Sequence, residues 1–170
     1  MKRLLLLRHG KSDWDTEYGR DHERPLAERG EHAARLMGRF LTAVGAAPGL
    51  IVSSSAVRAA STARLAHEAG GWSCDLRIEP ALYDAGPLSV VEVVRAVEDD
   101  VDSLLLTGHE PTFSGVAGGL IGSADIRFPT AGLFCAEFPV QRWEAVEMGR
   151  GMLLWFVTPK LLTAAGMAGE

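Results

Sequence analysis

Arginine and histidine side chains recur just after apolar runs in this 170-residue sequence. Arg8 and His9 follow the run 4–7, His109 closely follows the run 104–106, and Arg58 follows a third run on a serine-rich turn. Guanidinium groups match phosphate oxygens in bidentate geometry and stay charged at cellular pH. A neutral imidazole nitrogen can attack phosphorus. These residue types therefore predict phosphoryl-group chemistry.

The four side chains would divide this chemistry among them. His9 is predicted to be the nucleophile, so that hydrolysis proceeds through a phosphorylated enzyme that water then releases. Arg8 and Arg58 would bind the phosphoryl group, and His109, when protonated, would stabilise the negative charge that grows on its oxygens. Gly10 would let the backbone approach closely. The predicted substrate-binding residues are Arg8, Gly10, Ser12, Arg58 and His109.

The apolar runs and the segments between them predict the elements that position this chemistry. Short continuous apolar runs are typical of strands buried on both faces, and apolar residues at spacings of three and four predict helices between them. The helical segments are 33–44, which Gly45 would end, 90–97, which Ser89 and Glu92 would cap, and 113–120, which would start after Pro111. Alternating strands and helices predict parallel strands joined by right-handed crossovers.

The pattern changes after Ile121, where three closely spaced strand-like runs follow one another. These runs are 132–138, 143–148 and 152–157, and their short connections predict at least one antiparallel pairing. The predicted fold is an α/β three-layer sandwich with a mostly parallel central sheet, at least one antiparallel strand and helices on both faces. Ligands of such sheets bind at the carboxyl ends of the strands, where the two arginines and two histidines would meet.

The composition and net charge are typical of a single globular domain and argue against some classes of partner. With 47% apolar and 23% charged residues, the chain is typical of one globular domain over residues 1–170. A formal net charge of −5 argues against nucleic acid or an anionic membrane as partner. The apolar run near the amino end is too short for a secretory signal, so a cytoplasmic location is expected. The two separated cysteines form neither a metal motif nor a disulfide framework.

Each candidate residue also has a purely structural interpretation. His109 could be satisfied by a local hydrogen bond, and Arg58 could simply be solvated on a helix face. Their joint placement at strand ends favours a shared anion site instead. The other histidines, His22, His32 and His67, are predicted to be structural or exposed.

A metal site is a further alternative, and it would be built from His9, His109, Asp13, Asp15 and Glu110. The spacing of these residues matches no ligand signature, and the nearby arginines would repel a cation. No metal and no cofactor are therefore expected.

Several segments together resemble the histidine phosphatase superfamily, which is phosphoglycerate mutase-like in fold, and within it the SixA-type phosphohistidine phosphatases. The resemblance rests on residues 4–14, 22–30, 53–58, 108–111 and 155–160, and it leaves 161–170 as a C-terminal tail. It implies that His9 is phosphorylated, that Arg8 and Arg58 bind phosphate, and that His109 is the second pocket histidine. Where relatives carry a glutamate proton donor this chain has Asp84, the candidate general acid. Asp15, Ser55 and Glu110 depart from the family pattern.

The predicted function is removal of phosphate from protein phosphohistidine through a phospho-His9 intermediate. The segment 84–102 holds one short helix and leaves no room for a lid over a small metabolite, and an imidazole leaving group needs little help from an acid. Two alternatives stay open: hydrolysis of small phosphomonoesters with Asp84 as acid, and a non-catalytic module that binds a phosphorylated ligand. The expected partner is thus a phosphorylated protein or a small phosphorylated substrate.

Overall fold

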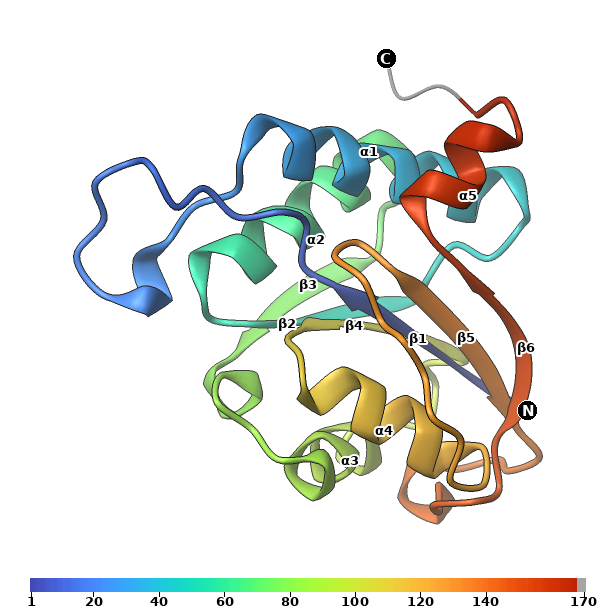
Figure 1. Ribbon diagram of the computed structural model, residues 1–170. Helices are drawn as coiled ribbons and strands as arrows, with labels where there is room; N and C mark the ends of the chain where they lie inside the picture. Colours follow the sequence, from blue (N-terminus) through green and yellow to red (C-terminus); the bar gives the residue numbers. More distant parts are fainter. Residues whose placement is uncertain (168–170) are drawn as a thin grey trace.

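A six-stranded sheet runs through the middle of the computed structural model, which describes residues 1–167 (Figure 1). The strands are β1 (Lys2–Arg8), β2 (Leu50–Ser54), β3 (Asp75–Glu79), β4 (Ser103–Gly108), β5 (Leu133–Phe138) and β6 (Met152–Val157). Their order in the sheet is β3-β2-β4-β1-β5-β6. The first four strands pair in parallel, whereas β5 runs antiparallel to both β1 and β6. The predicted mixed, mostly parallel sheet is confirmed.

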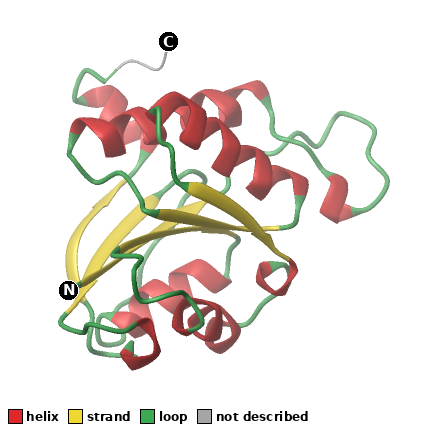
Figure 2. Cartoon of the chain, turned by 180° about the vertical axis from the view of Figure 1, so that it is seen from behind, coloured by secondary structure: helices red, strands yellow, loops and turns green. Residues whose placement is uncertain are grey.

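Helices cover both faces of the sheet (Figure 2). One layer contains α1 (Glu28–Ala43), α2 (Val57–Gly70) and α5 (Pro159–Ala164), and the other contains α3 (Pro87–Arg95) and α4 (Thr112–Leu120). Successive strand side chains point to opposite faces, so Leu5 and Leu7 of β1 join the core under α1 and α2. Leu4 and Leu6 join the core under α3 and α4. The three-layer prediction is therefore confirmed.

Two segments differ from the strand prediction. Residues 143–148 form no strand, because Trp143–Ala145 is a short 3-10 helix. The Trp143 ring is fully buried and its Nε1 donates to the carbonyl of Val101 at 2.7 Å, so burial of one large aromatic ring fixes this turn. Conversely, Asp75–Glu79 forms the edge strand β3 that was not predicted. Its residues are mostly exposed, which is why no apolar run marks it.

The start of α3 and the C-terminal segment also differ from the predictions. Helix α3 begins at Pro87 after Gly86, so Ser89 and Glu92 lie inside the helix and form no capping box. Proline is suited to the first helical position because its missing N–H would be unpaired there. The expected tail contributes to α5, and Leu162 is buried in the core that α1 lines. The part of the expected tail from 168 to 170 lies outside the described residues.

Both cysteines are free thiols. Cys135 lies on β5 with no exposed surface, and burial raises the pKa of its thiol to about 12. A thiol with so high a pKa is a poor nucleophile at neutral pH. Within residues 1–167, no helix has both the length and the apolar character needed to cross a lipid bilayer.

Candidate active site

The register of two neighbouring strands places His9 beside His109. Arg8, the last residue of β1, pairs with Gly108, the last residue of β4, so the two strands end at the same level of the sheet. The backbone N–H of His9 also donates to the carbonyl of Gly108 at 3.0 Å. As a result the two imidazole rings lie 5.3 Å apart between centroids. Two residues that are 100 positions apart in sequence thus face one volume at the carboxyl edge of the sheet.

Two guanidinium groups lie beside this pair of rings. Arg8 donates from Nη1 to the carbonyl of Phe128 at 2.8 Å. Arg58 is in the first turn of α2 and only 6% exposed, and its Nη1 donates to the carbonyl of Asp21 at 2.8 Å. Burial of the Arg8 guanidinium lowers its pKa. Nearby positive charges, those of Arg58 and Arg8 among them, lower the pKa values of both histidines, which places these side chains in one electrostatic environment.

Several of these side chains keep a buried nitrogen without a hydrogen-bond partner among residues 1–167. These atoms are Nε of Arg8, Nε of Arg58 and Nδ1 of His109. A buried polar group left unpaired costs about 1–3 kcal/mol, and such groups call for a specific explanation. A phosphoryl group has several oxygens that accept hydrogen bonds from guanidinium and imidazole N–H groups. The arrangement is therefore suited to a phosphoryl group.

His9 is held in a form that suits a nucleophile. Its ring is 7% exposed, and Nδ1 lies 2.7 Å from the carbonyl of Gly10. A carbonyl only accepts hydrogen bonds, so Nδ1 carries the proton and Nε2 keeps a free lone pair. Burial lowers the pKa of His9 to about 3, and the charges of His109, Arg58 and Arg8 act in the same direction. His9 is therefore neutral at pH 7.

His109 is also neutral in this arrangement. Burial lowers its pKa to about 4, with Arg58 the largest contributor among the neighbouring charges. Its Nε2 lies 2.7 Å from the hydroxyl of Ser54 at the end of β2. The protonated form considered from the sequence thus requires a bound anion, since a nearby negative charge raises the pKa of an imidazole.

Asp21 and Arg24 belong to the same cluster, although neither was among the predicted site residues. Arg24 is 6% exposed, and its Nη2 donates to Asp21 Oδ1 at 2.9 Å. Asp21 Oδ2 accepts from Nη2 of Arg58 at 3.1 Å and from the hydroxyl of Tyr83 at 3.0 Å. The hydrogen bond from Arg24, supported by those from Tyr83 and Arg58, lowers the pKa of Asp21 to about 2. This ionised carboxylate fixes both guanidinium groups in place.

The loop that carries Arg24 is irregular, which explains why sequence patterns did not single it out. The guanidinium carbon of Arg24 lies 3.7 Å from the centroid of the Trp14 ring, a cation–π contact. Nη1 of Arg24 donates to the hydroxyl of Ser12. Arg24 does lie in the segment 22–30 that carries the family resemblance, and Trp14 lies on the same connection between β1 and α1.

Gly10 and Ser12 are placed differently from their predicted substrate-binding positions. A Cβ on Gly10 would lie 2.5 Å from the carbonyl oxygen of Gly30, so the close approach is to α1. The N–H of Gly10 donates to the hydroxyl of Thr62. Ser12 is buried against Arg24. Both residues therefore position the histidine-bearing loop.

Asp84 lies at the rim of the pocket, as the general-acid hypothesis requires. It lines a cavity of about 150 Å³ together with Arg58, His109 and Glu110. Its φ of 55° lies in the left-handed region, which Asp tolerates better than most residues. Glu110 accepts from the N–H of Ser114 at 2.6 Å and so caps the first turn of α4.

The remaining histidines, and the residues that depart from the family pattern, form no hydrogen bond with the imidazoles of His9 and His109 among residues 1–167. His22 contacts the hydroxyl of Ser55 at 2.9 Å, and His67 contacts the carbonyl of Cys74 at 2.9 Å. His32 and Asp15 are at the surface. Among residues 1–167 no group of three or more His, Cys, Asp or Glu side chains could hold a metal ion.

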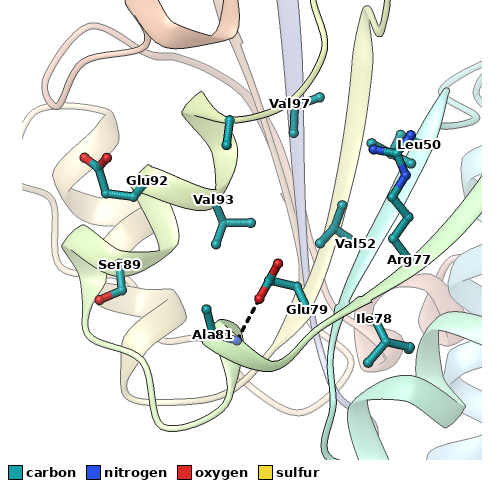
Figure 3. A pocket seen from close by; sticks show the side chains of 11 residues that line it. Leu50, Val52, Arg77, Ile78, Glu79, Ala81, Ser89, Glu92, Val93 and Val97 are labelled. Carbon is teal, nitrogen blue, oxygen red and sulfur yellow. Dashed lines mark hydrogen bonds between the residues drawn. The ribbon is translucent and has the colours of Figure 1, made fainter.

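A separate pocket of about 560 Å³ lies between β2, β3 and α3 (Figure 3). Its walls include Val52, Val93 and Glu79, and the Glu79 carboxylate accepts from the N–H of Ala81. Arg77 on its edge pairs with Glu98 at 2.8 Å. The pocket contains no histidine and none of the arginines of the cluster, so it is not a rival phosphoryl site.

Comparison with known proteins places this chain in a family. Residues 4–93, which include His9, Arg58 and Asp84, match the family model of the histidine phosphatase superfamily (branch 1). The chain belongs to the histidine phosphatase superfamily. The resemblance stated from the sequence is therefore confirmed.

Individual proteins also align over most of the chain. The uncharacterized protein Rv1276c of Mycobacterium tuberculosis is 37% identical over 164 residues, which cover 91% of this chain and all of that protein. The crystal structure of the proposed phosphohistidine phosphatase SixA from Agrobacterium tumefaciens matches with a TM-score of 0.79 and 27% identity. That match covers 93% of this chain and 98% of the other. A structure of the protein histidine phosphatase SixA with tungstate matches at a TM-score of 0.77 over 94% of this chain and 99% of that one, and at 23% identity it supports the fold alone.

Proposed function

We propose that this histidine phosphatase removes the phosphoryl group from phosphohistidine on a protein. The observation that carries the proposal is a pair of imidazoles with lowered pKa values, 5.3 Å apart between ring centroids, together with the guanidinium groups of Arg8 and Arg58, which hydrogen bonds to backbone carbonyls hold in place. Membership of the superfamily supports phosphatase activity, and the likeness to a SixA-type structure supports the substrate class.

The proposed reaction has two steps, and both begin from the His9 tautomer. Nε2 of His9 attacks phosphorus and forms a P–N bond while the P–N bond of the substrate breaks, and the departing imidazole takes a proton from solvent. Water then attacks phospho-His9, loses a proton to solvent and releases inorganic phosphate, with the electron pair of the P–N bond returning to Nε2. Arg8, Arg58 and His109 stabilise the charge on the phosphoryl oxygens in both steps.

The walls of the site support a macromolecular substrate. Between Asp84 and β4 the chain forms a single helix of nine residues, α3, which packs in the layer with α4 (Figure 1). A phosphorylated side chain on another protein can enter such a site. Its imidazole leaving group also needs less assistance from a general acid than an alkoxide does.

Hydrolysis of small phosphomonoesters is a second candidate, and the position of Asp84 favours it. The carboxyl group lines the same small cavity as Arg58 and His109, where a proton donor for an alcohol leaving group would be needed. The two candidates share the His9 chemistry and differ in their need for this acid.

A comparison of two substrates tests both candidates. Wild-type enzyme and Asp84→Asn would be assayed on a histidine-phosphorylated protein and on an alkyl phosphate, with a metal chelator present. We expect faster turnover of the phosphohistidine protein and little effect of Asp84→Asn on it. The loss with the alkyl phosphate should be about 10²-fold or more, the usual contribution of a general acid. Preferential turnover of the alkyl phosphate by the wild type would contradict the proposal.

A further inference from the structure

A cationic groove lies next to the catalytic cluster, which consists of Arg8, His9, Arg58 and His109 with Asp21 and Arg24. Its first part is a hollow of about 500 Å³ between the loop after β1, the start of α1 and the start of α5. The basic residues that line it are Lys11, Arg29, Arg127 and Lys160. A second hollow of about 570 Å³ continues along α1 and α5 and shares Arg29 and Lys160. No aspartate or glutamate of residues 1–167 lines either hollow.

The charges of the groove are unusual for this chain, which carries a net charge of −5. Ten of the 17 lysine and arginine side chains form ion pairs with carboxylates of residues 1–167. The seven without such a pair are Arg8, Lys11, Arg29, Arg39, Arg64, Arg127 and Lys160. Four of these seven line the groove, and Arg8 lies in the adjacent catalytic cluster. Like charges held together without counter-charges repel one another, which favours an anionic occupant.

The groove is continuous with the catalytic cluster through the backbone. Lys11 follows His9 by two residues, and its backbone packs so closely on α1 that a Cβ on Gly30 would lie 2.1 Å from the Lys11 carbonyl oxygen. On the other wall, Thr130 precedes Ala131, whose N–H donates to the carbonyl of His9 at 3.0 Å. The loop after β1 and the segment 128–131 therefore border both the groove and the cluster.

The size and lining of the groove exceed what a phosphate ion needs. Two joined hollows of this volume accommodate several residues of an extended or helical segment, and the second is lined in part by Ala33, Leu36 and Pro159. Asp84 and Glu110 line a separate small cavity beside Arg58 and His109, which none of the four groove cations lines. An acidic segment is thus attracted by the groove and repelled by these two carboxylates, which favours one direction of binding.

We propose that the groove formed by Lys11, Arg29, Arg127 and Lys160 docks an acidic segment of the phosphoprotein substrate, beside its phosphorylated histidine. This inference rests on the proposed function, because it names the class of protein that the same site would act on. The neighbouring cations supply affinity and direction, while the catalytic cluster supplies the chemistry.

Binding can be measured separately from turnover with a fluorescein-labelled, glutamate-rich peptide that carries no phosphate. The test variant is Arg29→Glu. The matched control is Arg64→Glu, which reverses the charge of an arginine on α2 that is also exposed and forms no ion pair with a carboxylate of residues 1–167. A carboxylate in the first turn of α1 suits the helix dipole, so the test variant should fold. We expect the dissociation constant to rise about fivefold for Arg29→Glu at low salt and to stay near the wild-type value for Arg64→Glu. Equal binding by wild type and Arg29→Glu would overturn the proposal.

Turnover supplies the second readout and separates this inference from the proposed function. Two histidine-phosphorylated substrates would be compared, one with acidic neighbours of the phosphosite and one with those carboxylates neutralised. We expect Arg29→Glu to lower the preference for the acidic substrate about fivefold, with the effect lost at high salt. A preference that is unchanged by Arg29→Glu would overturn the groove proposal. Failure of the wild type to release phosphate from either substrate would instead overturn the proposed function, while peptide binding would still report on the groove.

Discussion

The catalytic cluster and the cationic groove use the same residue types under opposite conditions. In the cluster, Arg58 is buried and tied to Asp21, and its neighbouring imidazoles are desolvated and neutral. In the groove, Arg29 and Lys160 are exposed. Charge in a buried, preorganised site acts strongly on a transition state, whereas exposed charge is screened by salt and contributes little per group. We therefore expect the catalytic cluster to carry out the chemistry and the cationic groove to bind the substrate protein.

Removing a buried guanidinium should have the largest effect. Arg58→Ala is expected to lower kcat about 10²–10³-fold, because losing one preorganised donor to a transition-state oxyanion typically costs that much. The measurement is kcat on a phosphohistidine protein under saturating substrate. Arg64→Ala is the matched control, since Arg64 lies on the same helix but is exposed. Similar kcat values for the two variants would contradict the claim that the buried Arg58, unlike the exposed Arg64, stabilises the transition state.

A smaller effect should appear in the pH dependence of stability. Burial lowers the pKa of His9 to about 3, below the value of about 6.5 expected in the unfolded chain. Below about pH 6.5 the unfolded chain therefore binds a proton that the folded protein does not, and the free energy of unfolding falls as pH falls towards 3. The contribution of His9 is at most about 1.4 kcal/mol per pH unit.

Urea unfolding between about pH 4.5 and 7.5 would measure this contribution. His9→Gln should show a shallower decline of stability towards acid than the wild type. The exposed His32 offers the control His32→Gln, which should leave the decline unchanged. A wild-type slope retained by His9→Gln would mean that His9 titrates normally and is not desolvated.

The positions of Arg8, His9, Arg58 and His109 could be predicted from the sequence because apolar runs mark the ends of the strands that precede them. Apolar runs locate β1, β2 and β4, and parallel pairing brings the residues after them to one edge. The pairing of Arg8 with Gly108 is the register that makes His9 and His109 neighbours. The antiparallel part of the sheet was predicted from three closely spaced runs. Two of these runs, β5 and β6, are strands and pair antiparallel, although the run between them contains a 3-10 helix instead of a strand.

The surroundings of the site could not be predicted, because they depend on contacts without sequence periodicity. Asp21 and Arg24 lie on an irregular loop whose shape depends on packing against Trp14 and Ser12. The groove exists because α5 packs beside α1, and that contact joins segments more than a hundred residues apart. Edge strand β3 differs from these cases, because Leu76 and Ile78 alternate with charged residues. This pattern is typical of a half-buried strand, but it lacks the continuous apolar run that marked the buried strands.

The most direct test of the account is the identity of the phosphorylated residue during turnover. Enzyme would be mixed with a histidine-phosphorylated protein, quenched without acid to preserve P–N bonds, and mapped by mass spectrometry, with His9→Gln as the control. The account predicts a transient phosphoryl group on His9 that is absent from the variant, together with loss of phosphate release. A phosphoryl group on any other residue, or steady turnover by His9→Gln, would contradict it.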